Sequence, residues 1–145
     1  MVNHGGKQGV LGVIGGKYGY IDQKGQIVIS LQFDSANNFF EGLALVNIGG
    51  QRKQLMLGTG TIGGNYGYID YRGQLVIKTQ FDDASNFSEG LAKIKIGKKW
   101  GYIDKNGLLK IPLQFDNARD FSYGVALVTI DEQERYIDQE GNFIY

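Results

Sequence analysis

Aspartate residues recur at two fixed places in this chain, and carboxylates at a regular spacing are the first candidates for chemistry. One series follows a Tyr-Ile pair and comprises Asp22, Asp70, Asp104 and Asp138. The other follows a Gln-Phe pair and comprises Asp34, Asp82 and Asp116. Converging carboxylates can hold metal ions or move protons. A glycine stands three residues after each member of the first series, which is typical of a turn, so we expect turn formation or capping for both.

The sequence lacks residues or elements that dinucleotide binding, nucleophilic catalysis and zinc binding require. Residues 58–63 read Gly-Thr-Gly-Thr-Ile-Gly, but a strand-like run follows where a dinucleotide site requires a helix. We expect an elongated hairpin here, with an anion-binding loop containing Arg52 and Lys53 as the alternative. His4 is the single histidine and there is no cysteine, which argues against nucleophilic pairs and zinc sites. The sequence therefore predicts no enzymatic activity, no metal and no cofactor.

Charge and hydropathy narrow the class of partner. The 145 residues include 15 basic and 15 acidic side chains, and this balance argues against nucleic acid or an anionic membrane as the partner. No apolar stretch is long enough to span a bilayer, and the first residues lack the features of a signal peptide. We expect no membrane contact, and the cytoplasm is the favoured compartment.

The elements that must position these residues come from an internal repeat. The run Tyr-Gly-Tyr-Ile-Asp occurs at 18–22 and 66–70, and Trp-Gly-Tyr-Ile-Asp occurs at 100–104. Gly67 and Gly101 lie 34 residues apart, whereas Gly19 and Gly67 lie 48 apart, so the first repeat carries 14 extra residues within 49–64. Fixed periods of this size indicate repeat architectures. We predict one domain, 1–145, consisting of a partial repeat 1–17, repeats 18–65, 66–99 and 100–133, and a partial repeat 134–145.

Each repeat predicts three short strands, typified by 100–103, 108–111 and 125–130. The third strands alternate, with Ala92, Ile94 and Ile96 opposite two lysines, as expected for a half-buried antiparallel strand. The second strands are predicted to turn alternate apolar residues towards the core, namely Ile27 with Ile29, Leu75 with Ile77, and Leu109 with Ile111. A short helical turn at 82–87 is an alternative to extended chain.

Glycines define the expected turns. The four-residue segments 22–25, 70–73, 104–107 and 138–141 all begin with aspartate and end with glycine. Aspartate can accept a backbone N–H two residues on, and glycine tolerates a left-handed conformation. A second hairpin uses Gly63-Gly64 or Gly97-Lys98, as primed two-residue turns require, and Asp131-Glu132 fills the same place less well.

These blocks resemble the WG-containing repeat family, also called KWG repeats, found mostly in bacterial proteins. The resemblance is carried by Lys99–Gly107 (Lys-Trp-Gly-Tyr-Ile-Asp-Lys-Asn-Gly), Gln114–Asp116 and Phe87–Ala92. Departures are the tyrosines at 18 and 66, Glu134-Arg135 in place of Trp-Gly, and the insertion. The family implies tandem β repeats with an interaction function and no assigned catalytic residues.

The fold expected is all-β, with tandem 34-residue antiparallel meanders in an open or solenoid-like array. A closed propeller-like ring is the alternative. The chain starts and stops out of phase with the repeat, and residues 2–6 echo 46–50, which suggests that it is cut from a longer array. Open end strands would then allow a homo-oligomer.

Positions that vary while the scaffold stays constant are the candidate binding residues. Tyr71 and Arg72 occupy a turn whose equivalents are polar, and Tyr123 replaces a glutamate near Arg119. Exposed tyrosine beside arginine is typical of interaction hot spots and of sugar platforms. With Arg52 and Lys53, these residues form the predicted binding set. The expected function is a scaffold that binds a protein partner or itself, and a glycan- or polymer-binding module is the alternative.

Overall fold

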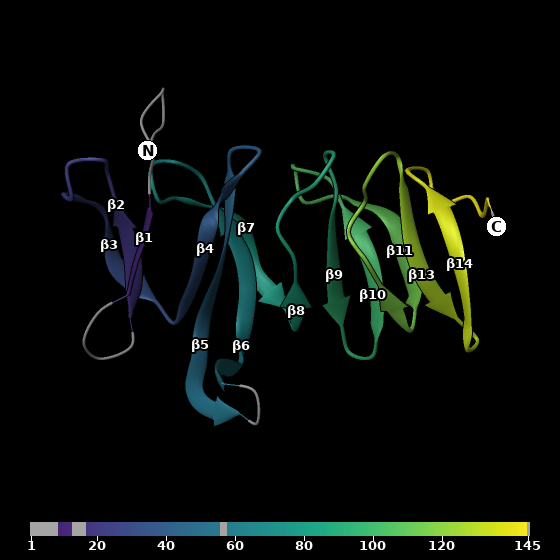
Figure 1. Cartoon of the computed structure of the whole chain (residues 1–145), viewed down its shortest axis with the longest axis horizontal. Helices are drawn as coiled ribbons and strands as arrows, with labels where there is room; N and C mark the ends of the chain where they lie inside the picture. Colours follow the sequence, from purple (N-terminus) through teal and green to yellow (C-terminus); the bar gives the residue numbers. More distant parts are fainter. Residues whose placement is uncertain (1–8, 13–16, 56–57, 145) are drawn as a thin grey trace. The chain divides into compact units, whose positions relative to one another are not determined.

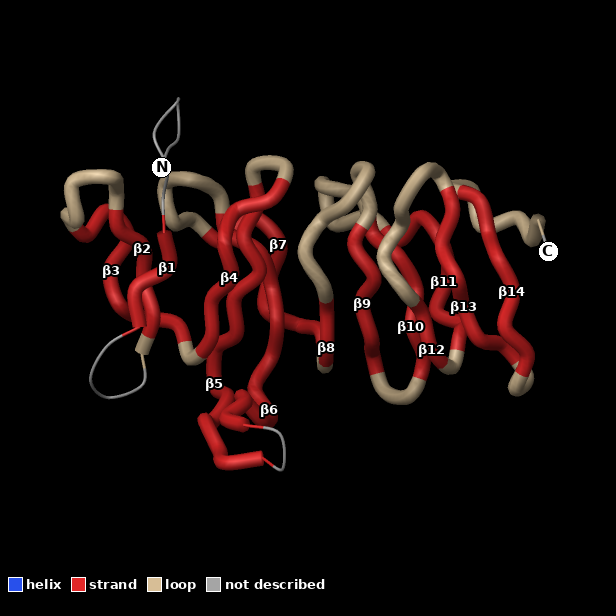
Figure 2. Tube along the Cα trace, viewed as in Figure 1, coloured by secondary structure: helices blue, strands red, loops and turns tan. Residues whose placement is uncertain are grey.

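The structure is a computed structural model that describes residues 9–12, 17–55 and 58–144, with side chains described for 17–50 and 63–144. Every regular element in the described part is a β-strand (Figures 1 and 2). Backbone packing divides the chain into two compact units, Met1–Gln80 and Phe81–Tyr145. The organisation of 1–145 as one domain stays a prediction. In the described part no helix is long and apolar enough to cross a bilayer.

The first unit contains two antiparallel sheets. One has the order β1-β2-β3, and the other has the order β4-β5-β6-β7. Their strands are β1 (Gly9–Gly12), β2 (Tyr18–Ile21), β3 (Ile27–Phe33), β4 (Ser35–Phe40), β5 (Leu43–Leu55), β6 (Gly58–Ile69) and β7 (Leu75–Phe81). Strands that are neighbours in the sheet are also neighbours in the chain, so each sheet is a meander.

The second unit repeats this plan. Its sheets have the orders β11-β10-β9-β8 and β12-β13-β14. Their strands are β8 (Asp83–Ala84), β9 (Ala92–Ile96), β10 (Lys99–Ile103), β11 (Leu109–Phe115), β12 (Asn117–Ala118), β13 (Val125–Ile130) and β14 (Gln133–Asp138). The prediction of tandem antiparallel meanders is confirmed, and each of the four described sheets is open, with two edge strands.

Sheet boundaries do not coincide with sequence repeats. In the sheet β8–β11, the first two strands come from the repeat 66–99, and β10 and β11 begin the next repeat, except for the first residue of β10. A short strand that the three-strand prediction lacked, β8, precedes the third strand, and β4 and β12 are its equivalents. The helical turn proposed at 82–87 is wrong, because the backbone of Asp83 and Ala84 pairs with β9 instead.

The Trp-Gly and Tyr-Gly pairs owe their glycine to a close approach of two backbones. A Cβ atom on Gly101 would lie 2.6 Å from the carbonyl oxygen of Ile111, which is far too close for a real side chain. The same crowding occurs at Gly19 and Gly67, against the carbonyl oxygens of the equivalent second strands. A β-bulge brings this backbone near: between Trp100 and Tyr102, β10 advances two residues while β11 advances four.

A second register shift, one residue further along the first strand, corrects the predicted facing of the second strands. Ile29, Ile77 and Ile111 are buried as expected, but Ile27, Leu75 and Leu109 are about half exposed. Between Tyr20 and Ile21, β2 advances one residue while β3 advances two, so the alternation of faces is broken before the strand enters the core. Ile27 and Ile29 therefore do not share a buried face.

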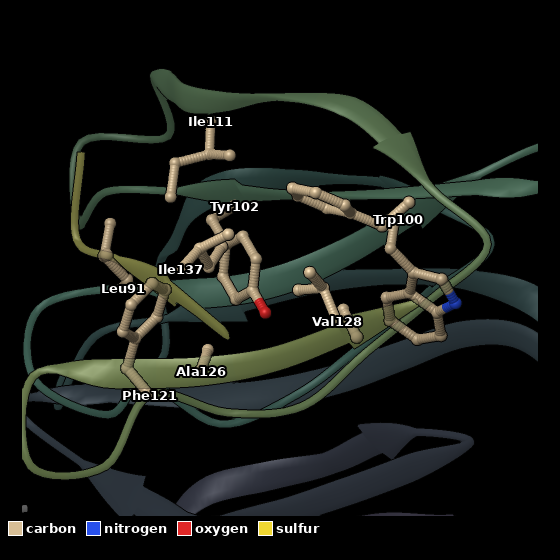
Figure 3. Close-up of a cluster of buried hydrophobic side chains, with 10 residues drawn as sticks. Leu91, Trp100, Tyr102, Ile111, Phe121, Ala126, Val128 and Ile137 are labelled. Carbon is tan, nitrogen blue, oxygen red and sulfur yellow. The ribbon is translucent and has the colours of Figure 1, made fainter. Parts of the chain in front are cut away.

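Each unit has its core between its two sheets. In the second unit, side chains from β10 and β11 meet side chains from β13 and β14 around Tyr102, which is fully buried (Figure 3). The Tyr102 hydroxyl donates a hydrogen bond of 2.6 Å to the carbonyl oxygen of Arg119, so its polar end is satisfied. In the first unit, Tyr20 occupies the equivalent place and donates to the carbonyl oxygen of Asn37 at 2.7 Å.

The insertion is an elongated hairpin, as predicted. Strands β5 and β6 continue to pair from Gly50–Gly63 to Leu55–Gly58. Asn47 is fully buried at the base of this extension and accepts a hydrogen bond from the Gly50 N–H, while its amide donates to the carbonyl oxygen of Gly63. The equivalent residues in the other repeats are Lys95 and Thr129, so the buried asparagine accompanies the insertion.

Candidate interaction surface

The first aspartate series forms turns, as expected. Asp104 Oδ1 accepts the N–H groups of Asn106 and Leu108, at 2.9 and 3.0 Å, and Gly107 has a left-handed φ of 84°. Asp22, Asp70 and Asp138 make the same two bonds in their own turns. The bond from the Asn142 N–H is the main cause that holds the pKa of Asp138 below its usual value.

The second series fastens the hairpin turn that follows the third strand. Asp34 and Asp82 accept the N–H groups of Gly49 and Gly97, at 2.6 and 2.7 Å. Asp116 accepts the N–H of Asp131 more loosely, at 3.3 Å, and its other oxygen binds the Lys99 ammonium at 2.6 Å. This ammonium is the main cause that lowers the pKa of Asp116. The expectation of turn formation or capping is confirmed for both series.

Metal-ligand residues do not gather in the described part of the chain, where no group of three histidine, cysteine, aspartate or glutamate side chains is placed to hold an ion. His4 lies outside the described residues. The glycine string 58–63 lies within β6, which continues as a strand to Ile69. The backbone of Arg52 and Lys53 belongs to β5, paired with Thr61 and Gly60, so these residues lie on a strand rather than in the loop that was the alternative.

Tyr71 and Arg72 occupy the turn after β6 in the first unit. Tyr71 is 41% exposed, and its ring stacks on Phe39 of β4, with 4.7 Å between ring centroids and 29° between the planes. The Arg72 guanidinium lies 3.7 Å from the Asp70 carboxylate and is largely exposed. The structure thus presents one aromatic face beside one cation, held by a neighbouring strand.

Arg119 and Tyr123 lie in the second unit, on either side of the buried Phe121. Arg119 is exposed as a whole, while its backbone is fixed by bonds to Leu127 and to the Tyr102 hydroxyl. Tyr123 is 97% exposed and has a left-handed φ of 53°. Its place in the turn before β13 therefore presents the whole side chain to solvent.

A clamp between successive turns was missed from the sequence. The Glu89 carboxylate accepts the N–H groups of Tyr123 and Gly124, at 2.7 and 2.9 Å, although these residues are 34 and 35 positions further along. The Gln139 amide donates to the same carboxylate at 3.2 Å. The recurrence of Glu-Gly at one place in the repeat was the available signal, because the pair adopts a left-handed turn at 41–42 and 89–90, and Tyr-Gly does so at 123–124.

Exposed apolar residues recur where each second strand begins. Two adjacent apolar residues are open to solvent at the start of β3 and of β7, a third pair consists of the first residue of β11 and the residue before it, and a fourth pair follows β14. They are Ile27 and Val28, Leu75 and Val76, Leu108 and Leu109, and Phe143 and Ile144, with exposed fractions between 38% and 62%. We call these the apolar pairs. Single exposed apolar residues are ordinary, but recurrence around the start of successive second strands indicates a shared role.

Open antiparallel meanders in tandem, with turns fastened from one copy to the next, define a β-repeat protein. The chain belongs to the WG containing repeat family, which matches it at residues 18–51, 66–100 and 100–133. The resemblance predicted from the motifs is therefore confirmed. Comparison with curated proteins and with solved structures gave no significant match.

Proposed function

We propose that this chain is a non-catalytic scaffold that binds other proteins, including further copies of itself. The observation that carries the proposal is the set of apolar pairs. These side chains contribute little to the buried cores, yet the first residue of the second strand is isoleucine or leucine in all three complete repeats and has a second exposed apolar residue beside it. Lys110 stands where Val28 and Val76 stand, and the third repeat has Leu108 on the other side instead. Apolar surface that recurs in successive copies suits a partner with a repeated binding face.

The carboxylates support the same proposal. Both aspartate series are engaged with backbone N–H groups of their own turns and hairpins, and Glu89 is engaged with the following turn. These groups stabilise the array, which is a role in presenting a surface rather than in transforming a substrate.

A double variant, Val76→Thr with Leu109→Thr, tests the proposal. Threonine keeps the strand propensity but removes apolar area, so affinity for a protein partner should fall by about tenfold or more. The partner is first identified by cross-linking mass spectrometry and then titrated in purified form by calorimetry. The matched control is Gln74→Thr with Lys110→Thr, which changes exposed neighbours of the same residues. Equal affinity of both double variants would contradict the role of the apolar pairs.

Glycan binding is the second candidate, favoured by the stacked and exposed ring of Tyr71 beside Arg72. Sugar rings bind flat on exposed aromatic faces, and a ring already supported from behind loses little freedom on binding. We expect Tyr71→Ala to abolish binding on a glycan array and Tyr71→Phe to retain most of it, with Tyr123→Ala tested in parallel. If wild-type protein binds no glycan, this candidate fails and the scaffold proposal is unaffected.

A further inference from the structure

The three complete second strands are edge strands of equal length. Each has seven residues, and among the described strands β3 pairs only with β2, β7 only with β6, and β11 only with β10. An edge strand carries backbone N–H and C=O groups on its outer side that can pair with another chain. Proteins commonly guard such edges with a charge or a proline.

The three edge strands differ in whether their central residue is one that opposes pairing with another chain. The strand β7 reads Leu-Val-Ile-Lys-Thr-Gln-Phe, with Lys78 at its centre, and β11 reads Leu-Lys-Ile-Pro-Leu-Gln-Phe, with Pro112 at its centre. The strand β3 reads Ile-Val-Ile-Ser-Leu-Gln-Phe and has neither charge nor proline. Its central residue, Ser30, is exposed.

Backbone geometry does not account for the difference between β3 and β11. The β2–β3 pairing shows register shifts at the same two places as the β10–β11 pairing, so the inner sides of these edges are bulged alike. What distinguishes β3 is the chemistry of its side chains. A seven-residue strand rich in β-branched and apolar residues, without charge or proline, is the kind of segment that pairs with copies of itself.

We propose that β3 is a self-association edge, which pairs antiparallel with β3 of a second copy of this chain across a two-fold axis. The inference rests on the proposed scaffold function and names the partner for this edge. A symmetric pairing about the strand centre places Ser30 opposite Ser30, Val28 opposite Gln32 and Ile27 opposite Phe33. The exposed Ile27 and Val28 thereby gain neighbouring side chains that cover part of their surface, and no like charges meet.

The same symmetric pairing is disfavoured at the other two edges. At β7 it would place Lys78 opposite Lys78, and like charges directly across a strand pair are destabilising. At β11 the central Pro112 has no N–H to donate, and proline interrupts a ladder at that point. A second copy is therefore directed to β3, and the interface closes at two chains because both copies use the same strand.

The test is a charge-exchange experiment at Ser30 on the full chain. Wild-type protein should show a concentration-dependent shift from monomer to dimer by sedimentation equilibrium. Ser30→Lys and Ser30→Glu should each weaken the dimer by at least about tenfold, because each places like charges across the axis. An equimolar mixture of the two variants should restore it, which an unfolded variant would not do. Ser30→Thr is the matched control and should dimerise like wild type.

A gain-of-association variant gives an independent measurement. Lys78→Ser gives β7 the same central residue as β3, so it should produce species larger than a dimer. Wild-type protein that stays monomeric at millimolar concentration would overturn the inference, as would a lysine–glutamate mixture that does not reassociate. Neither result bears on partner binding through Val76 and Leu109, since these variants leave both side chains intact.

Discussion

Replacing Gly101 with alanine is expected to lower the free energy of unfolding by about 3 kcal/mol, which is large for the addition of one methyl group. The new Cβ would stand 2.6 Å from the Ile111 carbonyl oxygen and 3.0 Å from the Pro112 carbonyl carbon, and both are backbone atoms that cannot rotate away. Relief requires β11 to move off β10, which would disturb the bulge and the side chains that it positions.

Trp100 makes this effect measurable in the second unit. It is the single tryptophan of the chain and is largely buried in the core of that unit, so its fluorescence reports unfolding there. Gly124→Ala is the matched control, because a Cβ there meets open space and only the left-handed φ of 80° is unfavourable, at about 1 kcal/mol. Equal destabilisation by the two variants would show that φ, and not backbone crowding, explains the glycine at 101.

Truncating Ile111 to alanine should also cost about 3 kcal/mol, whereas truncating Leu109 on the same strand should cost less than about 1 kcal/mol. Ile111 is fully buried between the two sheets, while Leu109 is 49% exposed. Gly141 fits closely against Ile111, since a Cβ atom on Gly141 would lie 3.3 Å from Ile111 Cγ2. Truncation of the Ile111 side chain therefore leaves a cavity between the backbone of β11 and the turn that contains Gly141.

The comparison of these two variants tests the corrected facing of the second strand. Urea denaturation followed by Trp100 fluorescence provides both free energies under the same conditions. If Leu109→Ala were as destabilising as Ile111→Ala, the strand would alternate regularly through its first residues and the β-bulge would not redirect them. The apolar pairs would then belong to the core, and the proposed binding surface would lose its basis.

The parts of the fold that were predictable are those that depend on local chemistry. Asp104 and Gly107 specify a turn through their own side chain and backbone freedom, and Ala92, Ile94 and Lys93 report a half-buried strand by alternation alone. The resemblance to the repeat family depended on the order of such local blocks, and it was confirmed for the same reason.

The parts that were missed depend on how strands meet. The short strands β8 and β12 have two residues each, too few for any periodic pattern. The facing of Leu109 was wrong because a bulge breaks the period of two that the argument assumed. The contact of Glu89 with Tyr123 joins two turns whose spacing is visible in the sequence, but the direction in which a side chain reaches between sheets is not.

Binding chemistry was the least predictable part of the site. Tyr71 and Tyr123 were selected because they interrupt a constant pattern, and both are exposed. The apolar pairs escaped notice because Ile27, Leu75 and Leu109 were assigned to the core. These side chains face solvent because of a β-bulge, and the sequence pattern did not reveal that bulge.

The mismatch between sequence repeats and sheets has a consequence for how such a chain can grow. Because β9 of one 34-residue period pairs with β10 of the next, a duplicated period would share a sheet with its neighbour. A new copy would thereby be joined to its neighbour by backbone hydrogen bonds in addition to the packing of side chains between sheets. Gene duplication in this architecture extends a continuous series of hydrogen-bonded repeats, whereas in a protein of independent domains it would add a separately folded unit.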